Sequence, residues 1–134
     1  YAATCKTISA GLPNNIKVEY LGGMSPIQLS ALYKNIHLFI TASKNENFGH
    51  SIAEALGYGR PVIVSDKTPW KGLKAKKVGS DLPLDQEKYV EEIEYFASLS
   101  QEAYDEYCTN ARAYALEVAN PSAILAAYQS LYEL

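Results

Sequence analysis

The stretch from residue 43 to 65 constrains the fold more than any other part of the chain. It follows an apolar run at 37–41, and polar residues at 43–47 interrupt that pattern before residues 51–56 take on helical composition. Two glycines and an Arg-Pro pair then end the helix, and a β-branched triplet follows at 62–64. This order predicts a strand, a loop, a helix and a strand, which is a βαβ unit with parallel strands.

Two carboxylates bracket the start of the predicted helix: Glu46 lies in the loop and Glu54 lies inside the helix. If one helix ran through both, they would be roughly 80° apart around the axis and about 12 Å apart along it, which suits a nucleotide-sized ligand. Because its helical neighbours are apolar, we expect Glu54 to be mostly buried and to need a charged or hydrogen-bonding partner. It could face a crevice and bind ligand hydroxyls. Alternatively, Glu46 is a solvated loop acid and Glu54 pairs with a distant lysine.

The main-chain N–H groups of Gly49, His50 and Ser51 lie at the predicted N-terminus of this helix. Such groups have no partner inside the helix, and the helix dipole places partial positive charge there. The sequence therefore predicts that this loop binds a phosphate group.

These residues resemble a known family. The run from Glu46 to Gly49, then Glu54 and the Gly-Arg-Pro-Val-Ile segment at 59–63, are similar to the E-x7-E signature of the nucleotide-sugar glycosyltransferases of family 4, the group 1 glycosyltransferases. Those enzymes have two Rossmann-like domains with the active site between them. The resemblance implies that residues 1–134 are a single domain, most of the C-terminal nucleotide-sugar-binding domain of a longer enzyme.

The resemblance also implies an activity: retaining transfer of a sugar from a nucleoside diphosphate sugar to an acceptor hydroxyl, without a metal or another cofactor. Glu46 would be the catalytic residue, binding hydroxyls of the transferred sugar near the reacting carbon. An acceptor domain and diphosphate-gripping Arg and Lys residues would lie upstream, so the isolated chain is expected to be inactive. The donor would be held by main-chain amides and one carboxylate, from Phe48, Gly49, His50, Ser51 and Glu54.

A turn-rich loop follows the second strand and carries Thr68-Pro69-Trp70. Similar segments occur in bacterial members of the family that build surface polysaccharides, which implies a saccharide or lipid-linked acceptor. Trp70 could contact donor or acceptor sugar or be buried under the loop, and burial is favoured. The alternative function is a non-catalytic nucleotide-binding or scaffolding domain on the same fold, because a fold does not fix a function.

Charge is unevenly distributed. From Lys44 to Lys77 seven Lys or Arg residues face three acids, whereas from Asp81 onward eleven acids face two basic residues. The first block suits an anionic ligand, and the second would repel nucleic acid, so no nucleic-acid partner is expected. Peripheral contact with an anionic membrane is an alternative use of the basic loop. Its lysines are Lys67, Lys71, Lys74, Lys76 and Lys77.

No apolar run is long enough to span a membrane, and no leader is recognisable, so the expected location is the cytoplasm, with the inner face of the membrane as an alternative. Cys5 and Cys108 have no neighbouring ligand residues and are expected to be reduced, buried thiols. His37 is expected at the start of a strand, not as a ligand. No metal site is predicted.

The segments before the motif have clear signals of their own. Residues 16–21 alternate apolar and charged side chains, which predicts a strand, and in the family Gly23 and Met24 would follow it near the nucleotide base. Ser25 and Gln28 form a capping box around a proline, which predicts a helix start.

After the motif we expect a short strand at 78–84 and three amphipathic helices, beginning at Asp85, Ser100 and Asn120. The predicted fold class is α/β: a Rossmann-like parallel sheet of about four strands with flanking helices and three C-terminal helices.

Overall fold

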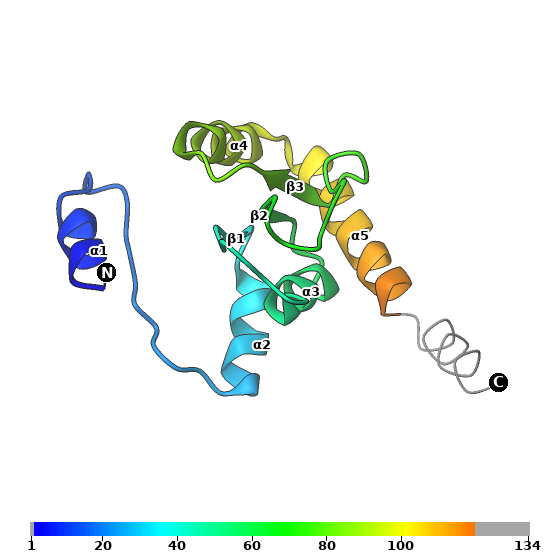
Figure 1. The fold of residues 1–134 in the computed structure, drawn as a ribbon, viewed down its shortest axis with the longest axis horizontal. Coiled ribbons are helices and arrows are strands. Elements are labelled where there is room, and N and C mark those ends of the chain that lie inside the picture. Colours follow the sequence, from blue (N-terminus) through cyan, green and yellow to red (C-terminus); the bar gives the residue numbers. More distant parts are fainter. Residues whose placement is uncertain (1, 120–134) are drawn as a thin grey trace. The chain divides into compact units, whose positions relative to one another are not determined.

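The computed structural model describes residues 2–119, which form helices and a parallel sheet (Figure 1). The chain divides into two compact units, residues 1–30 and 31–134, and the division falls within α2. The helix predicted from Asn120 lies outside the described residues. The elements are α1 (Ala2–Ala10), α2 (Pro26–Asn35), β1 (Phe39–Thr41), α3 (His50–Gly57), β2 (Val62–Ser65), β3 (Gly79–Leu82), α4 (Gln86–Ser98) and α5 (Gln101–Val118).

The strand predicted at residues 16–21 is not formed. The first unit contains α1 followed by irregular chain, and Val18 and Tyr20 are 44% and 56% exposed. A strand needs hydrogen bonds from a neighbouring strand, and the described part of this unit supplies none. The observed sheet therefore has three strands instead of about four.

The capping box at the start of α2 is confirmed. The main-chain N–H of Ser25 donates to Oε1 of Gln28 at 2.8 Å, and the N–H of Gln28 donates to Oγ of Ser25 at 3.4 Å. Two of the amides that a helix N-terminus leaves unpaired are thus satisfied by side chains three residues apart.

The sheet has the order β1-β2-β3, and both pairs of strands are parallel. The central strand β2 is buried at all four residues, as expected for a parallel strand covered on both faces. Ile63 pairs with Ile40 on one side and with Ser80 on the other. The strands predicted around the motif and at 78–84 are confirmed, although the first and last are shorter than predicted.

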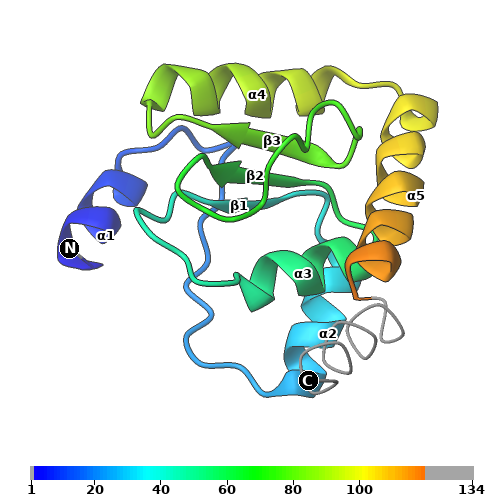
Figure 2. The ribbon, with the colours of Figure 1, turned by 45° about the vertical axis from the view of Figure 1, so that its right-hand side comes forward.

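The sheet is covered by helices on both faces, with α3 on one side and α4 on the other (Figure 2). Ile63 packs on Phe96 of α4 and Tyr107 of α5. Val62 and Val64 point to the opposite face, because side chains alternate along a strand, and there they meet α3. Figure 2 also shows α5 passing the amino ends of the strands, so their carboxyl ends lie at the edge away from α5.

Candidate functional site

The loop of residues 42–49, here called the motif loop, joins the carboxyl end of β1 to α3. Its first residues are fixed to the edge of the sheet. The hydroxyl of Ser65, at the end of β2, donates to the carbonyl of Ser43, and the hydroxyls of Ser43 and Thr41 lie 3.1 Å apart. The motif loop therefore begins at the carboxyl edge of the sheet, where ligands of Rossmann-like domains bind.

Gly49 ends the motif loop in a conformation that favours glycine. It is buried, with φ 80° and ψ 60° in the left-handed region. A Cβ here would lie 2.8 Å from Cδ1 of Ile52 and 3.1 Å from Nε1 of Trp70. It would also lie 3.2 Å from Cγ of Glu46, so the stem of this loop acid packs directly beside Gly49.

The helix α3 begins at His50, one residue after Gly49, as the sequence predicted. No side chain caps its N-terminus, and the carbonyl of Gly49 accepts the N–H groups of Ile52 (2.9 Å) and Ala53 (3.1 Å). His50 and Ser51, in the first turn, are exposed. The helix N-terminus thus has no side-chain cap, and phosphate binding there stays a prediction.

The expectation that Glu54 is mostly buried is wrong. The helix buries Ile52, Ala55 and Leu56, whereas Glu54 is exposed. Two residues along a helix correspond to about 200° of rotation, so Glu54 points away from the side that Ile52 buries. The separation expected for one helix running through both Glu46 and Glu54 does not apply, because α3 begins after Glu46 and only Glu54 lies on it.

Glu54 has a neighbour that the sequence did not reveal. Burial raises the pKa of Tyr33, on α2, and the nearby charge of Glu54 adds to the rise. The Tyr33 hydroxyl donates to the carbonyl of Ser51 at 3.2 Å, and Tyr33 is 3% exposed. A buried phenol thus holds the first turn of α3 in place, close to the Glu54 carboxylate. Sequence spacing gave no signal for this, because Tyr33 and Glu54 lie on different helices.

Trp70 is buried, at 5% exposure, as favoured from the sequence. Its indole Nε1 donates to the carbonyl of Phe48 at 2.6 Å. Phe48 is 44% exposed. The centre of its ring lies 5.0 Å from that of the His50 ring and 5.7 Å from that of the Trp70 ring. The loop after β2 is therefore joined to the motif loop by a hydrogen bond as well as by packing.

The five lysines of the basic loop after β2 have partners within the chain. Lys74 pairs with Glu92 at 3.1 Å and Lys77 with Glu106 at 2.8 Å, so the basic loop meets the acidic helices. An anionic ligand or membrane therefore cannot be inferred from charge counts alone. The remaining contacts are Lys67 with the Asp66 carboxylate at 3.1 Å, Lys71 with the Asp66 carbonyl, and Lys76 with the Tyr114 ring, 4.9 Å from its centre.

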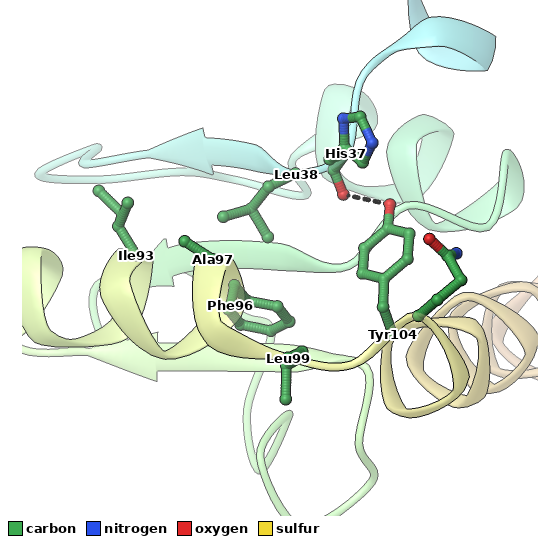
Figure 3. A pocket seen from close by; sticks show the side chains of 8 residues that line it. His37, Leu38, Ile93, Phe96, Ala97, Leu99 and Tyr104 are labelled. Atoms are coloured by element: carbon green, nitrogen blue, oxygen red, sulfur yellow. Dashed lines mark hydrogen bonds between the residues drawn. The ribbon is translucent and has the colours of Figure 1, made fainter.

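A hollow of about 390 Å³ lies elsewhere, at the amino end of β1 (Figure 3). It is lined by apolar side chains including Leu38, Ile93 and Phe96, and the Tyr104 hydroxyl donates to the His37 carbonyl at 2.6 Å beside it. Its position, at the end of the sheet opposite the motif loop, separates it from the candidate site.

The part of the chain that the structure describes contains no group of three or more His, Cys, Asp or Glu side chains placed to hold a metal ion. Within the same residues, no helix combines the length and the apolar character needed to cross a bilayer. Cys5 and Cys108 are free thiols, and both are half-buried instead of buried.

A parallel sheet covered on both faces, with a helix that follows a glycine at its carboxyl edge, defines a Rossmann-like α/β domain. The chain belongs to the group 1 glycosyl transferases, whose family model matches residues 1–114. It is also similar to the UDP-N-acetylglucosamine–peptide N-acetylglucosaminyltransferase GtfA subunit of Streptococcus parasanguinis, with 46% identity over 39 residues. That match spans 29% of this chain and 8% of the relative.

Proposed function

We propose that this chain forms the donor-binding part of a retaining glycosyltransferase, which moves a sugar from a nucleoside diphosphate sugar to an acceptor hydroxyl without a metal ion. The observation that carries the proposal is the convergence at Gly49 of the Glu46 stem, 3.2 Å from the Cβ position, and the uncapped N-terminus of α3. Membership of the group 1 family supports glycosyl transfer. The relative's name makes UDP the first nucleotide to test.

In this proposal the main chain stabilises the departing diphosphate. Negative charge develops on the leaving group as the bond to the sugar breaks, and main-chain N–H groups of Phe48, Gly49, His50 and Ser51 would hydrogen-bond to the sugar and the phosphates. Since these donors are fixed by the start of a helix, little reorganisation is needed during the reaction.

The two carboxylates have different tasks. Glu46 would bind hydroxyls of the transferred sugar near the reacting carbon. Its side-chain stem packs beside Gly49, which would keep the carboxylate near the donor. Glu54 would bind the ribose, with Tyr33 holding the first turn of the helix that carries it. We assign no protein nucleophile.

The wider setting belongs to the same proposal. The resemblance of the Trp70 loop to those of enzymes that build surface polysaccharides supports a saccharide or lipid-linked acceptor, bound by a further domain of a longer enzyme. Arg and Lys residues outside this chain would add to the grip on the diphosphate. The reaction would take place in the cytoplasm or at the inner face of the membrane.

The test is a kinetic comparison in the longer enzyme that the proposal requires. Glu46→Gln should lower kcat, because its contacts strengthen as the sugar reacts, whereas Glu54→Gln should mainly raise KM for the donor, because the ribose contact is the same in both states. Glu94→Gln, an exposed acid on α4, is the control and should change neither. If the first two variants have unaltered donor kinetics, the E-x7-E assignment is wrong.

A further inference from the structure

Trp70 is placed where the motif loop, the loop after β2 and α5 meet. We propose that Trp70 is a positioning residue for the donor diphosphate: its indole N–H holds the Phe48 carbonyl and so sets the direction in which the amide of Gly49 points. This inference rests on the proposed function, because it takes the Gly49 amide to be a phosphate ligand.

The peptide bond between Phe48 and Gly49 links the two loops. The carbonyl of Phe48 and the N–H of Gly49 belong to the same planar unit, and in a trans peptide they point in opposite directions. This bond is trans, since no cis peptide bond occurs among the described residues 2–119. Because Nε1 of Trp70 donates to that carbonyl at 2.6 Å, the Gly49 N–H must point away from the buried indole. One hydrogen bond thus orients an amide proposed to bind the ligand.

The indole also limits how Gly49 can move. Its Nε1 lies 3.1 Å from the position of a Cβ at Gly49, so the ring lies directly against this residue. A glycine with φ 80° has many other conformations available in a free chain. Trp70 and Ile52 both crowd the position beside its Cα, and this packing favours the observed conformation.

The loop that carries Trp70 is anchored at both ends. Thr68, 2% exposed, donates from Oγ1 to the carbonyl of Ser65 at 3.0 Å, at the end of β2. Leu73 is fully buried, and its N–H donates to Oδ1 of Asp81 on β3 at 3.0 Å. Because both ends are tied to strands, the loop is suited to hold the indole in one place instead of opening as a lid.

The far side of the indole rests on α5. The rings of Trp70 and Tyr114 are 6.1 Å apart in an edge-to-face arrangement, a favourable geometry for aromatic pairs. The ring of Tyr114 in turn carries the ammonium group of Lys76, 4.9 Å from its centre. The indole therefore has support on the side opposite the motif loop.

A residue that acts only by packing would need an apolar ring and no N–H group. The test therefore removes the N–H and keeps an aromatic side chain. Trp70→Phe does this with a natural residue, although its ring is smaller. Because the chain has one tryptophan, replacing tryptophan by benzothienylalanine during expression exchanges the N–H of this residue alone for sulfur. The second change preserves the shape of the side chain, so it stays informative if Trp70→Phe fails to fold.

The first readout is the Kd of the chain for UDP. Both changes should weaken binding by about threefold to tenfold, the range that loss of one hydrogen bond gives. Phe96→Leu is the matched control, since it removes buried aromatic packing between β2 and α4 away from the motif loop. It should lower the free energy of unfolding without changing Kd.

The second readout needs no ligand: the exchange rates of the Gly49, His50 and Ser51 amides with water, measured by NMR. They should change in both Trp70 variants and remain as in the unmodified chain in Phe96→Leu. The inference is overturned if the benzothienylalanine protein keeps both the Kd for UDP and these exchange rates. If the unmodified chain binds no nucleoside diphosphate, the proposed function fails, and the exchange rates alone decide whether Trp70 orients the loop.

Discussion

The carboxylate of Glu92, on α4, accepts a hydrogen bond of 2.6 Å from the hydroxyl of Ser80, on β3. Both residues are nearly inaccessible, at 6% and 1% exposure. The other carboxylate oxygen receives the ammonium group of Lys74 at 3.1 Å, although the Lys74 side chain is 67% exposed. A charged group is thus buried between the sheet and a helix, and its partner inside the protein is a neutral hydroxyl.

Ser80→Ala should therefore be costly. It leaves a buried carboxylate oxygen without its donor, which should lower the free energy of unfolding by about 2 kcal/mol. Lys74→Met removes an exposed partner and should cost about 0–1 kcal/mol. Chemical denaturation of both variants gives the comparison. An effect of Lys74→Met as large as that of Ser80→Ala would mean that the ion pair stabilises the buried carboxylate as much as the hydroxyl does, and would contradict this prediction.

The glycines at the two ends of α3 offer a matched pair of substitutions. Gly49→Ala, just before the helix, places a Cβ 2.8 Å from Ile52 at φ 80°, so it should lower the free energy of unfolding by roughly 2 kcal/mol or more. Gly57→Ala, at the last helical residue, places a Cβ with no atom from outside the helix within 4 Å and should raise the free energy of unfolding by about 0.4–1 kcal/mol. Thermal or chemical unfolding measures both, and a tolerated Gly49→Ala would contradict the geometry at the helix entry.

The first of these results changes how Gly49 can be used as a probe. A larger side chain at Gly49 is the simplest change by which to crowd a bound diphosphate. In the structure the Cβ would meet Ile52, Trp70 and Glu46, which are atoms of the protein itself. Weaker ligand binding by such a variant would therefore report damage to the loop instead of a blocked phosphate site.

His50→Ala is the better test of binding through the main chain. The His50 side chain is exposed in the first turn of α3, whereas its N–H belongs to the proposed phosphate site. Removing the imidazole should change the Kd for UDP by less than about twofold, because the amide remains. A tenfold loss of affinity, measured by calorimetry, would show that the side chain binds the ligand and would reduce the role of the amides.

Local signals in the sequence predicted most elements of the second unit. Asp85 accepts the N–H groups of Glu87 and Lys88, and Ser100 accepts that of Ala103, so α4 and α5 begin where the capping residues indicated. The entry to α3 was equally predictable, because Gly49 follows a polar loop and precedes a helical run. In each case the deciding interactions are close in sequence.

Features that depend on partners distant in sequence were not predictable. Alternation at residues 16–21 indicated a strand, but the pattern cannot say which neighbour would pair with it. In α4 the apolar residues Val90 and Ile93 belong to the apolar side of the amphipathic pattern, yet they are 46% and 40% exposed while Glu92 is buried. Glu92 can be buried because Ser80 lies opposite, and that contact follows from the tertiary fold alone.

Buried and half-buried tyrosines predict how stability depends on pH. Among the residues that the structure describes, burial is the largest cause that raises the pKa of five tyrosines above the usual 10.0. A pKa that is higher in the folded state than in the unfolded state means that the folded protein holds the proton more tightly. The stability from these groups is therefore complete below pH 10.0 and is lost as the pH rises further. The five are Tyr33, Tyr89, Tyr104, Tyr107 and Tyr114.

We accordingly expect the free energy of unfolding to fall as the pH is raised above 10.0, and phenolate absorbance to show a second, later group of tyrosines in the native chain. In denaturant all tyrosines should titrate together, because the burial that separates them is gone. Tyr107→Phe should remove one late phenol, since Tyr107 is buried beside Phe96 and its hydroxyl lies 3.3 Å from that of Tyr95. A single early transition in the native chain would show that these phenols are solvated and would contradict the packing of α5 against α4.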